Sequence, residues 1–301
     1  MTPSGQLAQF EPWMKIILAE VEHSLEQFLP PADALPARLH AAMRYALQGG
    51  GKRVRPLLAY AAGAMFGAKK EALQRVAVAL EMVHAYSLVH DDMPCMDDDA
   101  LRRGQPTVHI AYDEATALLV GDALQAQAFL VLADSSSLPP VRQVKMLRML
   151  AQAAGSQGMC GGQAIDLASV GLRLSQAQLE HMHHLKTGAL LRAALMLGAL
   201  CGKELSTSES LALDAYGSAI GLAFQVVDDI LDATADSATL GKTAGKDAAA
   251  NKPTYVSILG LAPSQALAEK LRQDAYAALA PFGAPADRLR ELADLIVQRK
   301  A

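Results

Sequence analysis

The residues best suited to chemistry gather first between positions 91 and 104. Five aspartates lie within nine positions: Asp91, Asp92, Asp97, Asp98 and Asp99. Such a density of negative charge is costly unless a cation lies among the carboxylates, and oxygen ligands suit a hard cation such as Mg²⁺. Arg102 and Arg103 follow directly and can hold an anion that the metal brings with it, most simply a phosphate.

A second acidic cluster lies far downstream, where Gln225, Asp228, Asp229 and Asp232 occur at offsets of 0, 3, 4 and 7. On a helix these offsets place all four on one face. A solvated acidic face is the simple alternative, but the residues between them are apolar all round, which indicates a buried helix. Buried carboxylates need cationic partners. Two facing clusters predict a cage for several Mg²⁺ ions and a diphosphate.

Asp97 lies six positions after Asp91, which an ideal helix would place on the wrong face. Pro94 intervenes, so we expect the helix to end or kink there and Asp97 to swing back. An EF-hand is excluded because the central Gly and the terminal Glu are absent. His84 lies two turns before Asp91 and can face the same cavity, although a satisfied core histidine is the alternative reading.

Cations occur at several other places. Lys52 and Arg55 follow Gly49–Gly51 at a helix start, which is a natural anion site, although the sequence does not match a P-loop. Lys186 precedes Thr187 in an apolar helical region and needs an anion, unless it only extends its charge to the surface. Gly51 belongs to the same glycine turn as Lys52.

The longest interruption between predicted helices is the polar stretch 234–251, which we expect to be a lid that orders when a diphosphate binds. Lys242 and Lys252 lie in and beside it, and Lys246 has no assigned role. In the segment 161–166, Asp166 is expected to tie two helices. The histidines at 181, 183 and 184 look like a metal tract, but a surface helix is the preferred interpretation.

Composition bounds the class of protein. Of 301 residues, 51% are hydrophobic but only 5% aromatic, and Ala, Leu and Met dominate, which predicts an all-α fold. A net charge of −4 without a basic stripe argues against nucleic acid. Three separated cysteines favour a reduced, cytoplasmic setting, and the N-terminal residues do not form a signal peptide. The apolar run Ala189–Cys201 is too short to span a bilayer, so no membrane insertion is expected.

We expect one domain, residues 1–301, and no strands. Apolar periodicity and Pro/Gly punctuation predict the following helices: 6–28, 34–48, 56–66, 70–92, 108–133, 140–155, 156–169, 175–202, 207–235, 252–260, 262–280 and 286–299.

These pieces, taken in this order, resemble the trans-isoprenyl diphosphate synthases, and most closely the bacterial farnesyl diphosphate synthases. The resemblance rests on Asp91-Asp92-x4-Asp97 with Leu101-Arg102-Arg103-Gly104, on Lys186-Thr187, on Phe224-Gln225 and on Asp228-Asp229-x2-Asp232. It covers nearly the whole chain. It implies an all-α antiparallel bundle around a central cavity, usually as a homodimer, with the two Asp motifs facing each other across the cavity mouth.

The resemblance also implies roles for individual residues. About three Mg²⁺ ions per site would bind the diphosphate of dimethylallyl or geranyl diphosphate. Their ligands would be Asp91, Asp92, Asp97, Asp228 and Asp232. The clamp on that diphosphate would be Arg102, Lys186, Lys242 and Lys252. The diphosphate of isopentenyl diphosphate would be held by Gly51, Lys52, Arg55, His84 and Arg103, with help from Arg299 and Lys300.

Ionisation of the allylic substrate leaves a carbocation that an apolar cavity must protect from water. Thr187 and Gln225 would place oxygen dipoles near it, and the released diphosphate would take the final proton. Tyr86 lies five residues before Asp91, about 7.5 Å down the helix axis, and Ser87 four before. In this family an aromatic residue at position 86, with two inserted residues around Met93-Pro94, accompanies a fifteen-carbon product.

Three alternatives remain open from the sequence. A geranylgeranyl diphosphate synthase would use the same chemistry with a deeper cavity. A class I terpene cyclase would carry an Asn/Ser/Glu metal motif in place of Asp228-Asp229-x2-Asp232. A non-catalytic subunit of a heteromeric synthase would make no product on its own.

Overall fold

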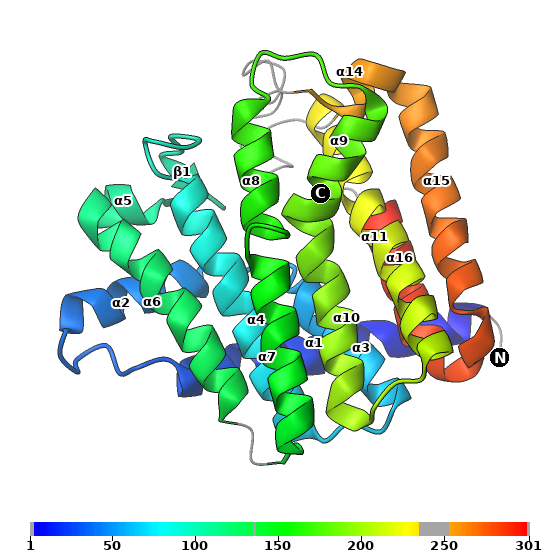
Figure 1. Ribbon diagram of the computed structural model, residues 1–301, viewed down its shortest axis with the longest axis horizontal. Coiled ribbons are helices and arrows are strands. Elements are labelled where there is room, and N and C mark those ends of the chain that lie inside the picture. Colours follow the sequence, from blue (N-terminus) through cyan, green and yellow to red (C-terminus); the bar gives the residue numbers. More distant parts are fainter. Residues whose placement is uncertain (1–2, 135–136, 235–252, 300–301) are drawn as a thin grey trace.

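The computed structural model describes residues 3–134, 137–234 and 253–299, and these are almost entirely α-helical (Figure 1). The all-α prediction is confirmed. The longer helices are α1 (Pro3–Phe28), α2 (Ala37–Gln48), α3 (Val54–Met65), α4 (Lys70–Asp91), α6 (Glu114–Ala133), α7 (Pro140–Ala154), α8 (Met159–Ala168), α9 (Gln176–His183), α10 (Ala189–Gly202), α11 (Thr207–Thr234), α15 (Leu261–Ala278) and α16 (Asp287–Gln298). The short ones are α5 (Val108–Ala111), α14 (Tyr255–Leu259), a π-helical turn η1 (His184–Gly188) and the 3₁₀ turns η2 (Ala280–Phe282) and η3 (Ala284–Ala286).

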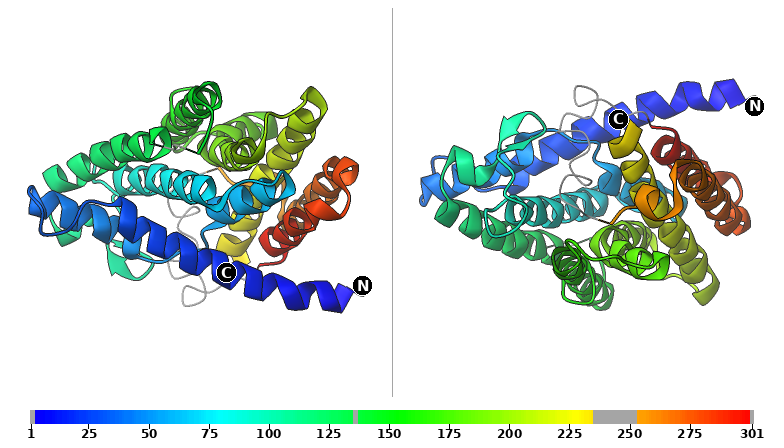
Figure 2. Two further views of the ribbon diagram at one scale, coloured as in Figure 1. Left: turned by 90° about the horizontal axis from the view of Figure 1, so that it is seen from below. Right: turned by 90° about the horizontal axis from the view of Figure 1, so that it is seen from above.

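Helix α4 forms the middle of the bundle. Every residue from Val76 to Val83 is buried, and the helix packs against α1, α3, α6 and α10. Both views of Figure 2 show α1 lying along the outside of this group. A helix that is apolar all round is expected in such a central position. Its C-terminal end, which carries the first Asp cluster, lies at the same end of the bundle as the end of α11 (Figure 1).

The predicted helix 175–202 is interrupted. It begins at a capping box in which Ser175 and Gln178 satisfy each other's backbone amides, and it ends at Gly202. Between α9 and α10, however, residues His184–Gly188 form a π-helical turn. Such turns insert an extra residue into a helix and often occur at functional sites. Here the inserted turn carries Lys186 and Thr187.

The prediction that the apolar helix is too short to span a bilayer was wrong. With the π-turn included, the helical segment Gln176–Gly202 has 27 residues. By length and composition alone, this segment and the helices Glu114–Ala133 and Thr207–Thr234 are long and apolar enough to cross a membrane. The prediction considered only the apolar run Ala189–Cys201, whereas the helical segment that contains this run begins at Gln176.

The structure adds a small β-hairpin that sequence patterning did not predict. Strand β1 (Leu101–Arg102) pairs antiparallel with β2 (Gln105–Pro106), with Leu101 opposite Pro106. The two turn residues, Arg103 and Gly104, have φ values of 53° and 77°. Positive φ at both positions is what a two-residue hairpin turn of type I′ requires. Two-residue strands carry too little periodicity to be recognised from sequence. This hairpin nevertheless sets the direction of the Arg102 and Arg103 side chains.

Candidate active site

The end of α4 folds back on itself as the sequence predicted. The helix ends at Asp91, and the backbone amide of Asp97 donates to the carbonyl oxygen of Asp91 at 2.8 Å. The amide of Asp99 donates to the carbonyl oxygen of Asp92 at 3.1 Å. Carbonyl groups that a helix end leaves without partners are thereby satisfied. The return of Asp97 toward Asp91 is confirmed, with Pro94 inside the reversing loop.

The first two carboxylates of this cluster are buried and held from two directions. Asp92 accepts from Arg102 Nε at 2.8 Å and from its Nη2 at 2.6 Å, a forked arrangement. Asp91 accepts from Gln163 Nε2, on α8, at 3.0 Å. Burial raises the pKa of both carboxyls, while Lys186 and Gln163 act in the opposite direction on Asp91 and Arg102 does so on Asp92.

Gln163 is a site residue that sequence reasoning missed. It is 7% exposed and its amide contacts both the carboxylate of Asp91 and, at 3.4 Å, the carbonyl of Ser87. The sequence showed only a polar residue between apolar helices. Its position three residues before Asp166, one turn away on the same helix face, was the available signal.

The π-turn η1 places Lys186 and Thr187 between the two clusters. Lys186 Nζ donates to Asp166 Oδ2 at 2.5 Å, which confirms Asp166 as a tie between helices. Burial acts to lower the pKa of Lys186, but the charges of Asp166 and Asp91 outweigh it and raise that pKa. Thr187 Oγ1 donates to Gln225 Oε1 at 2.8 Å. The turn therefore contacts α8 on one side and α11 on the other.

Two glycines permit this close approach. A Cβ atom on Gly162 would lie 2.1 Å from the backbone nitrogen of Lys186, and one on Gly221 would lie 2.8 Å from the Cα of Gly188. No real Cβ atom fits at such distances, so glycine is required at both positions. The backbone of the π-turn is thus held between α8 and α11.

A cationic cluster surrounds His84 beside the glycine turn. Burial lowers the pKa of His84 well below its usual range, and Arg55, Arg103 and Arg102 lower it further, so the ring is neutral. Burial also lowers the pKa of Arg55 to about 10, and its Nε is buried without a hydrogen-bond partner among the described residues. Buried donors that lack a partner are the expected surroundings of an anion.

Arg103 connects this cluster to the first Asp loop. Its guanidinium donates to the carbonyl of Gly50 and lies where a side chain on Gly51 would begin, with 2.7 Å to an ideal Cβ. Gly51 has a φ of 140°, which a side chain would strain. Lys52 lies beside it, and partial burial together with the charge of Arg299 lowers its pKa. The predicted residues Gly51, Lys52 and Arg103 therefore lie together.

Arg53 was not singled out from the sequence, and the structure gives it a structural role. It is 5% exposed and binds Glu81 on α4 at 2.6 Å and Glu22 on α1 at 2.8 Å. It also donates to the carbonyl of Leu47 at 2.7 Å. The charge of Arg53 is used to join α1, α2 and α4 beneath the cationic cluster.

The second cluster divides its residues among three neighbours. Gln225 binds the π-turn, and Asp229 accepts from the backbone amide of Tyr255, the first residue of α14, at 2.7 Å. Asp228 accepts from Arg299 at 2.5 Å, and the Arg299 guanidinium lies 3.9 Å over the ring of Phe224. Asp232 is buried. The prediction of a buried helix face is confirmed, except that Asp228 keeps 42% of its side chain exposed.

The carboxylate donor set fits Mg²⁺, which prefers oxygen ligands. Among the described side chains, in residues 9–134, 137–234 and 253–299, no three His, Cys, Asp or Glu residues are grouped closely enough to hold a metal ion. Arg102 and Arg299 occupy carboxylates of the two clusters. An arginine on each cluster fulfils the demand for positive charge that a metal would otherwise meet. A metal bound there would exchange with them.

Several predicted residues lie outside the described part of the chain. These are Lys242, Lys246, Lys252 and Lys300, together with the expected lid 234–251 apart from Thr234. The histidine tract is described, and the surface-helix interpretation was wrong for His183, which is 6% exposed. Of the three histidines only His181 is exposed. His181 and His183 lie two residues apart on α9, which places them on opposite faces of a regular helix.

Tyr86 and Ser87 lie beneath the first cluster on α4. Tyr86 is 4% exposed, and its hydroxyl donates a long hydrogen bond of 3.4 Å to the carbonyl of Ala154 at the end of α7. Its ring meets the ring of His90 edge to face, with centroids 6.0 Å apart. Ser87 donates to the carbonyl of His84 at 2.8 Å. Tyr86 thus closes the space between α4 and α7.

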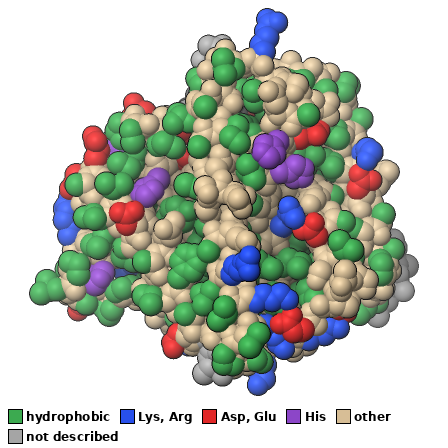
Figure 3. Space-filling model, viewed as in Figure 1, with side chains coloured by type: hydrophobic (Ala, Val, Ile, Leu, Met, Phe, Trp, Pro, Cys, Tyr) green, Lys and Arg blue, Asp and Glu red, His purple; other side chains and the backbone are tan. Residues whose placement is uncertain are grey.

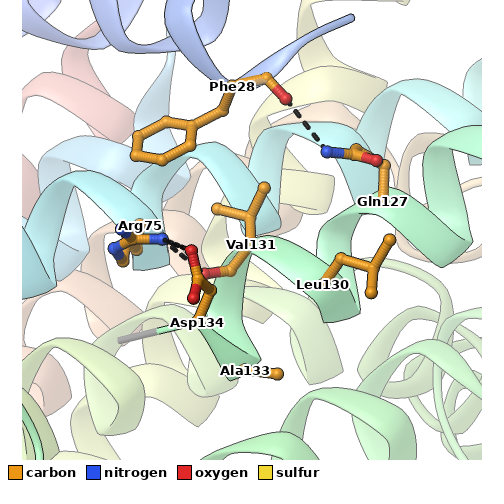
Figure 4. A pocket seen from close by; sticks show the side chains of 7 residues that line it. All are labelled: Phe28, Arg75, Gln127, Leu130, Val131, Ala133 and Asp134. Carbon is orange, nitrogen blue, oxygen red and sulfur yellow. Dashed lines mark hydrogen bonds and ion pairs between the residues drawn. The ribbon is translucent and has the colours of Figure 1, made fainter. Parts of the chain in front are cut away.

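A pocket of about 50 Å³ lies beside the first cluster and is lined by Asp92, Arg102 and Arg103, among others. A larger pocket of about 400 Å³ lies at the opposite end of α4 and α6, where Phe28, Arg75, Leu130 and Asp134 line it (Figure 4). Its polar groups are bound to one another, since Arg75 pairs with Asp134 at 3.3 Å. Volume alone therefore points away from the chemistry, and the charged groups locate the site.

Comparison with known proteins identifies the family. A profile of the polyprenyl synthetases matches residues 36–279. The chain belongs to this family. It is 50% identical over 292 residues to a probable farnesyl diphosphate synthase of Bradyrhizobium diazoefficiens, covering 96% of this chain and 87% of the relative. It is also 45% identical to the large subunit 1 of a chloroplastic heterodimeric geranylgeranyl pyrophosphate synthase of Arabidopsis thaliana, covering 94% and 79%.

Solved structures agree in fold. An FPP/GFPP synthase of Zymomonas mobilis superposes with a TM-score of 0.87 at 41% identity, covering 96% of this chain and 99% of that one. A geranyltransferase of Helicobacter pylori, complexed with magnesium and isoprenyl diphosphate, superposes with a TM-score of 0.81 at 31% identity, covering 95% and 96%. The predicted isoprenoid synthase fold and the prenyltransferase class are confirmed.

Proposed function

We propose that this prenyltransferase makes farnesyl diphosphate by adding isopentenyl diphosphate to dimethylallyl and then to geranyl diphosphate. The observation that carries the proposal is the position of Lys186 on the π-turn. Against the effect of burial, the charges of Asp166, Asp91 and Asp97 raise the pKa of Lys186. The next residue of the turn, Thr187, donates to Gln225 on α11. One turn thereby faces both acidic clusters. A diphosphate between the clusters would contact Lys186 directly.

The chain's own residues divide the work between two diphosphates. Arg102 and Lys186, with Lys242 and Lys252, bind the allylic diphosphate beside Asp91, Asp92, Asp97, Asp228 and Asp232, which would hold Mg²⁺. About three ions, when bound, would neutralise the charge that develops on the leaving diphosphate. Gly51, Lys52, Arg55, His84 and Arg103 bind the isopentenyl diphosphate, and the neutral ring of His84 can donate a hydrogen bond to it without adding charge.

The reacting carbons lie below these groups, toward the buried part of α4. Thr187 and Gln225 orient oxygen dipoles toward the allylic cation, and the buried residues around Tyr86 exclude water. The released diphosphate accepts the proton lost from the new prenyl chain. Tyr86 and Ser87 limit the length of that chain to fifteen carbons.

The second candidate product is geranylgeranyl diphosphate, because relatives at 45% identity carry that name. Incubation of the purified protein with Mg²⁺, isopentenyl diphosphate and dimethylallyl diphosphate, followed by chain-length analysis, separates the candidates. A fifteen-carbon product supports the proposal and a twenty-carbon product contradicts it. No product at all would favour a non-catalytic subunit.

We also propose a homodimer built on one domain of residues 1–301 in a cytoplasmic setting. Helix α6 exposes large apolar side chains, with Leu118 at 49%, Leu119 at 54% and Leu130 at 63% exposure. Hydrophobic side chains are spread over this part of the surface in Figure 3. Apolar patches of this kind mark association surfaces. Light scattering of the purified protein should give twice the chain mass, and a monomer would contradict the assignment.

A further inference from the structure

His183 and Tyr255 form a buried stack beside the candidate site. His183 is the last residue of α9, directly before the π-turn, and Tyr255 is the first residue of α14. Their ring centroids are 5.6 Å apart with an interplanar angle of 25°, and their exposures are 6% and 0%. The stack therefore joins two segments that both contact α11.

Both rings carry polar atoms without partners in the described part of the chain. Neither ring nitrogen of His183 makes a hydrogen bond there, and the hydroxyl of Tyr255 makes none. Buried polar atoms of this kind cost stability, so phenylalanine would serve a purely structural stack better. The ring contact and its position relative to the two clusters, rather than these polar atoms, are what connect the two segments.

The stack completes a second connection between the π-turn and α11. The first connection is direct, from Thr187 to Gln225 at 2.8 Å. The second runs from His183 through the ring of Tyr255, whose backbone amide donates to Asp229 at 2.7 Å. Gln225 and Asp229 lie one helical turn apart on the same face of α11. Two attachments one turn apart hold this face of α11 against the π-turn and α14.

Asp228 lies between these attachments and is the member of its cluster bound to Arg299. Because Gln225 and Asp229 on either side of it are held, the backbone of Asp228 is held relative to Lys186 as well. We propose that the His183–Tyr255 stack is a positioning contact for prenyl transfer, which holds the second Asp cluster in register with the Lys186–Thr187 turn. The proposal rests on the assignment of this turn to the allylic diphosphate.

Among the described residues, the stack makes no hydrogen bond to the glycine turn or to the cluster around His84. Asp228 acts on Lys52 and Arg55 only through its charge, so loss of the stack should affect the allylic substrate far more than isopentenyl diphosphate. Tyr255→Leu should raise the KM for geranyl diphosphate about tenfold, because small displacements of positioned groups are costly. The KM for isopentenyl diphosphate should change by less than about twofold. Tyr255→Phe and His183→Phe keep the ring contact and should behave like the wild type. His183→Leu should repeat the effect of Tyr255→Leu.

Tyr216→Leu is the matched control, since Tyr216 is equally buried and bonds to the carbonyl of Leu289 away from the site. It should lower the melting temperature without changing the ratio of the two KM values. The same KM ratio in Tyr216→Leu and Tyr255→Leu would overturn the proposal, because the stack would then be structural only. Loss of selectivity in Tyr255→Phe would overturn it too, because the hydroxyl rather than the ring would then act.

Calorimetric binding of geranyl diphosphate with Mg²⁺, in the absence of isopentenyl diphosphate, separates this proposal from the function on which it rests. Weaker binding by Tyr255→Leu supports the stack. Unchanged binding by Tyr255→Leu, when the wild type binds, overturns the stack alone. If the wild type itself does not bind, the allylic assignment and the stack fall together.

Discussion

The two acidic clusters are held in opposite ways. In the first, Asp91 and Asp92 are buried at a helix end, where Gln163 and Arg102 bind them. In the second, Asp228 is half-exposed in a continuous helix and pairs with Arg299, near the end of the chain. The first cluster is shaped mainly by the loop and hairpin that follow it. The second depends on contacts from distant segments.

This difference matters for how a metal–diphosphate complex would assemble. Preorganised groups cost no reorganisation when charge develops, which is the condition for strong electrostatic catalysis. The first cluster meets that condition for Asp91 before any ligand arrives. The second presents one exchangeable carboxylate between two anchored neighbours, Gln225 and Asp229. In the first cluster Asp91 is therefore preorganised, whereas in the second cluster Asp228 is the exchangeable carboxylate.

The largest expected effect is the loss of a carboxylate from either cluster. Asp91→Ala and Asp228→Ala should each lower kcat by at least about 10²–10³, the usual size of one electrostatic contact. Steady-state kinetics at saturating Mg²⁺ measure this, with circular dichroism to verify the fold. Asp134→Ala is the control, because Asp134 lies in the distant pocket and should keep full activity. Near-normal activity in either cluster variant would contradict the two-cluster mechanism.

A backbone collision between the clusters should be nearly as damaging. In Gly162→Ala the new Cβ would lie 2.1 Å from the nitrogen of Lys186, so the π-turn must move. A displacement near 1 Å can cost about 10² in rate, and kcat/KM for geranyl diphosphate should fall by that amount. Gly198→Ala meets the oxygen of Ala59 at the same 2.1 Å, away from the site. If both variants lose only stability, the turn does not position substrate.

The product should lengthen when α4 loses the aromatic side chain of Tyr86 beneath the first cluster. Tyr86→Ala should shift the product from fifteen carbons toward twenty or more, because the ring closes the space between α4 and α7. Tyr86→Phe keeps the ring and should keep the fifteen-carbon product. Chain-length analysis of both variants measures this. An unchanged distribution in Tyr86→Ala would place the cavity floor elsewhere.

A smaller effect concerns the pH dependence of stability at His183, near the second cluster. Burial lowers the pKa of His183 to about 4, opposed by Asp166 and reinforced by Lys186 and His184. Between pH 4 and the unfolded value near 6.5, the unfolded chain binds a proton that the folded chain does not. The free energy of unfolding should therefore fall as pH drops through this window, by up to about 3 kcal/mol.

His183→Phe should remove that part of the pH dependence. Denaturant unfolding of wild type and variant at pH 7 and pH 4.5 measures the difference, and His84, which is also neutral, contributes equally to both. Equal pH dependence in the two proteins would show that His183 does not titrate between the folded and unfolded states in this range.

Local sequence patterns predicted the first cluster better than the second. Pro94 after Asp91 was enough to predict the reversed loop, since both lie within a few residues of one helix end. Periodicity also predicted the burial of α11. The roles of Gln163, Tyr255 and the π-turn depend on contacts across many residues, and one inserted residue in a helix leaves no periodic signal. The burial of His183 likewise depends on a distant residue, Tyr255, whose ring stacks on it.

The most direct test of the account combines Asp91→Ala and Asp228→Ala in one chain. If the clusters hold one shared metal–diphosphate complex, each single loss already disables it, and the double variant should have a kcat within about tenfold of the weaker single variant. Turnover of isopentenyl and geranyl diphosphates at saturating Mg²⁺ gives all four values. Losses that multiply in the double variant would mean that the clusters act independently, and would contradict the account.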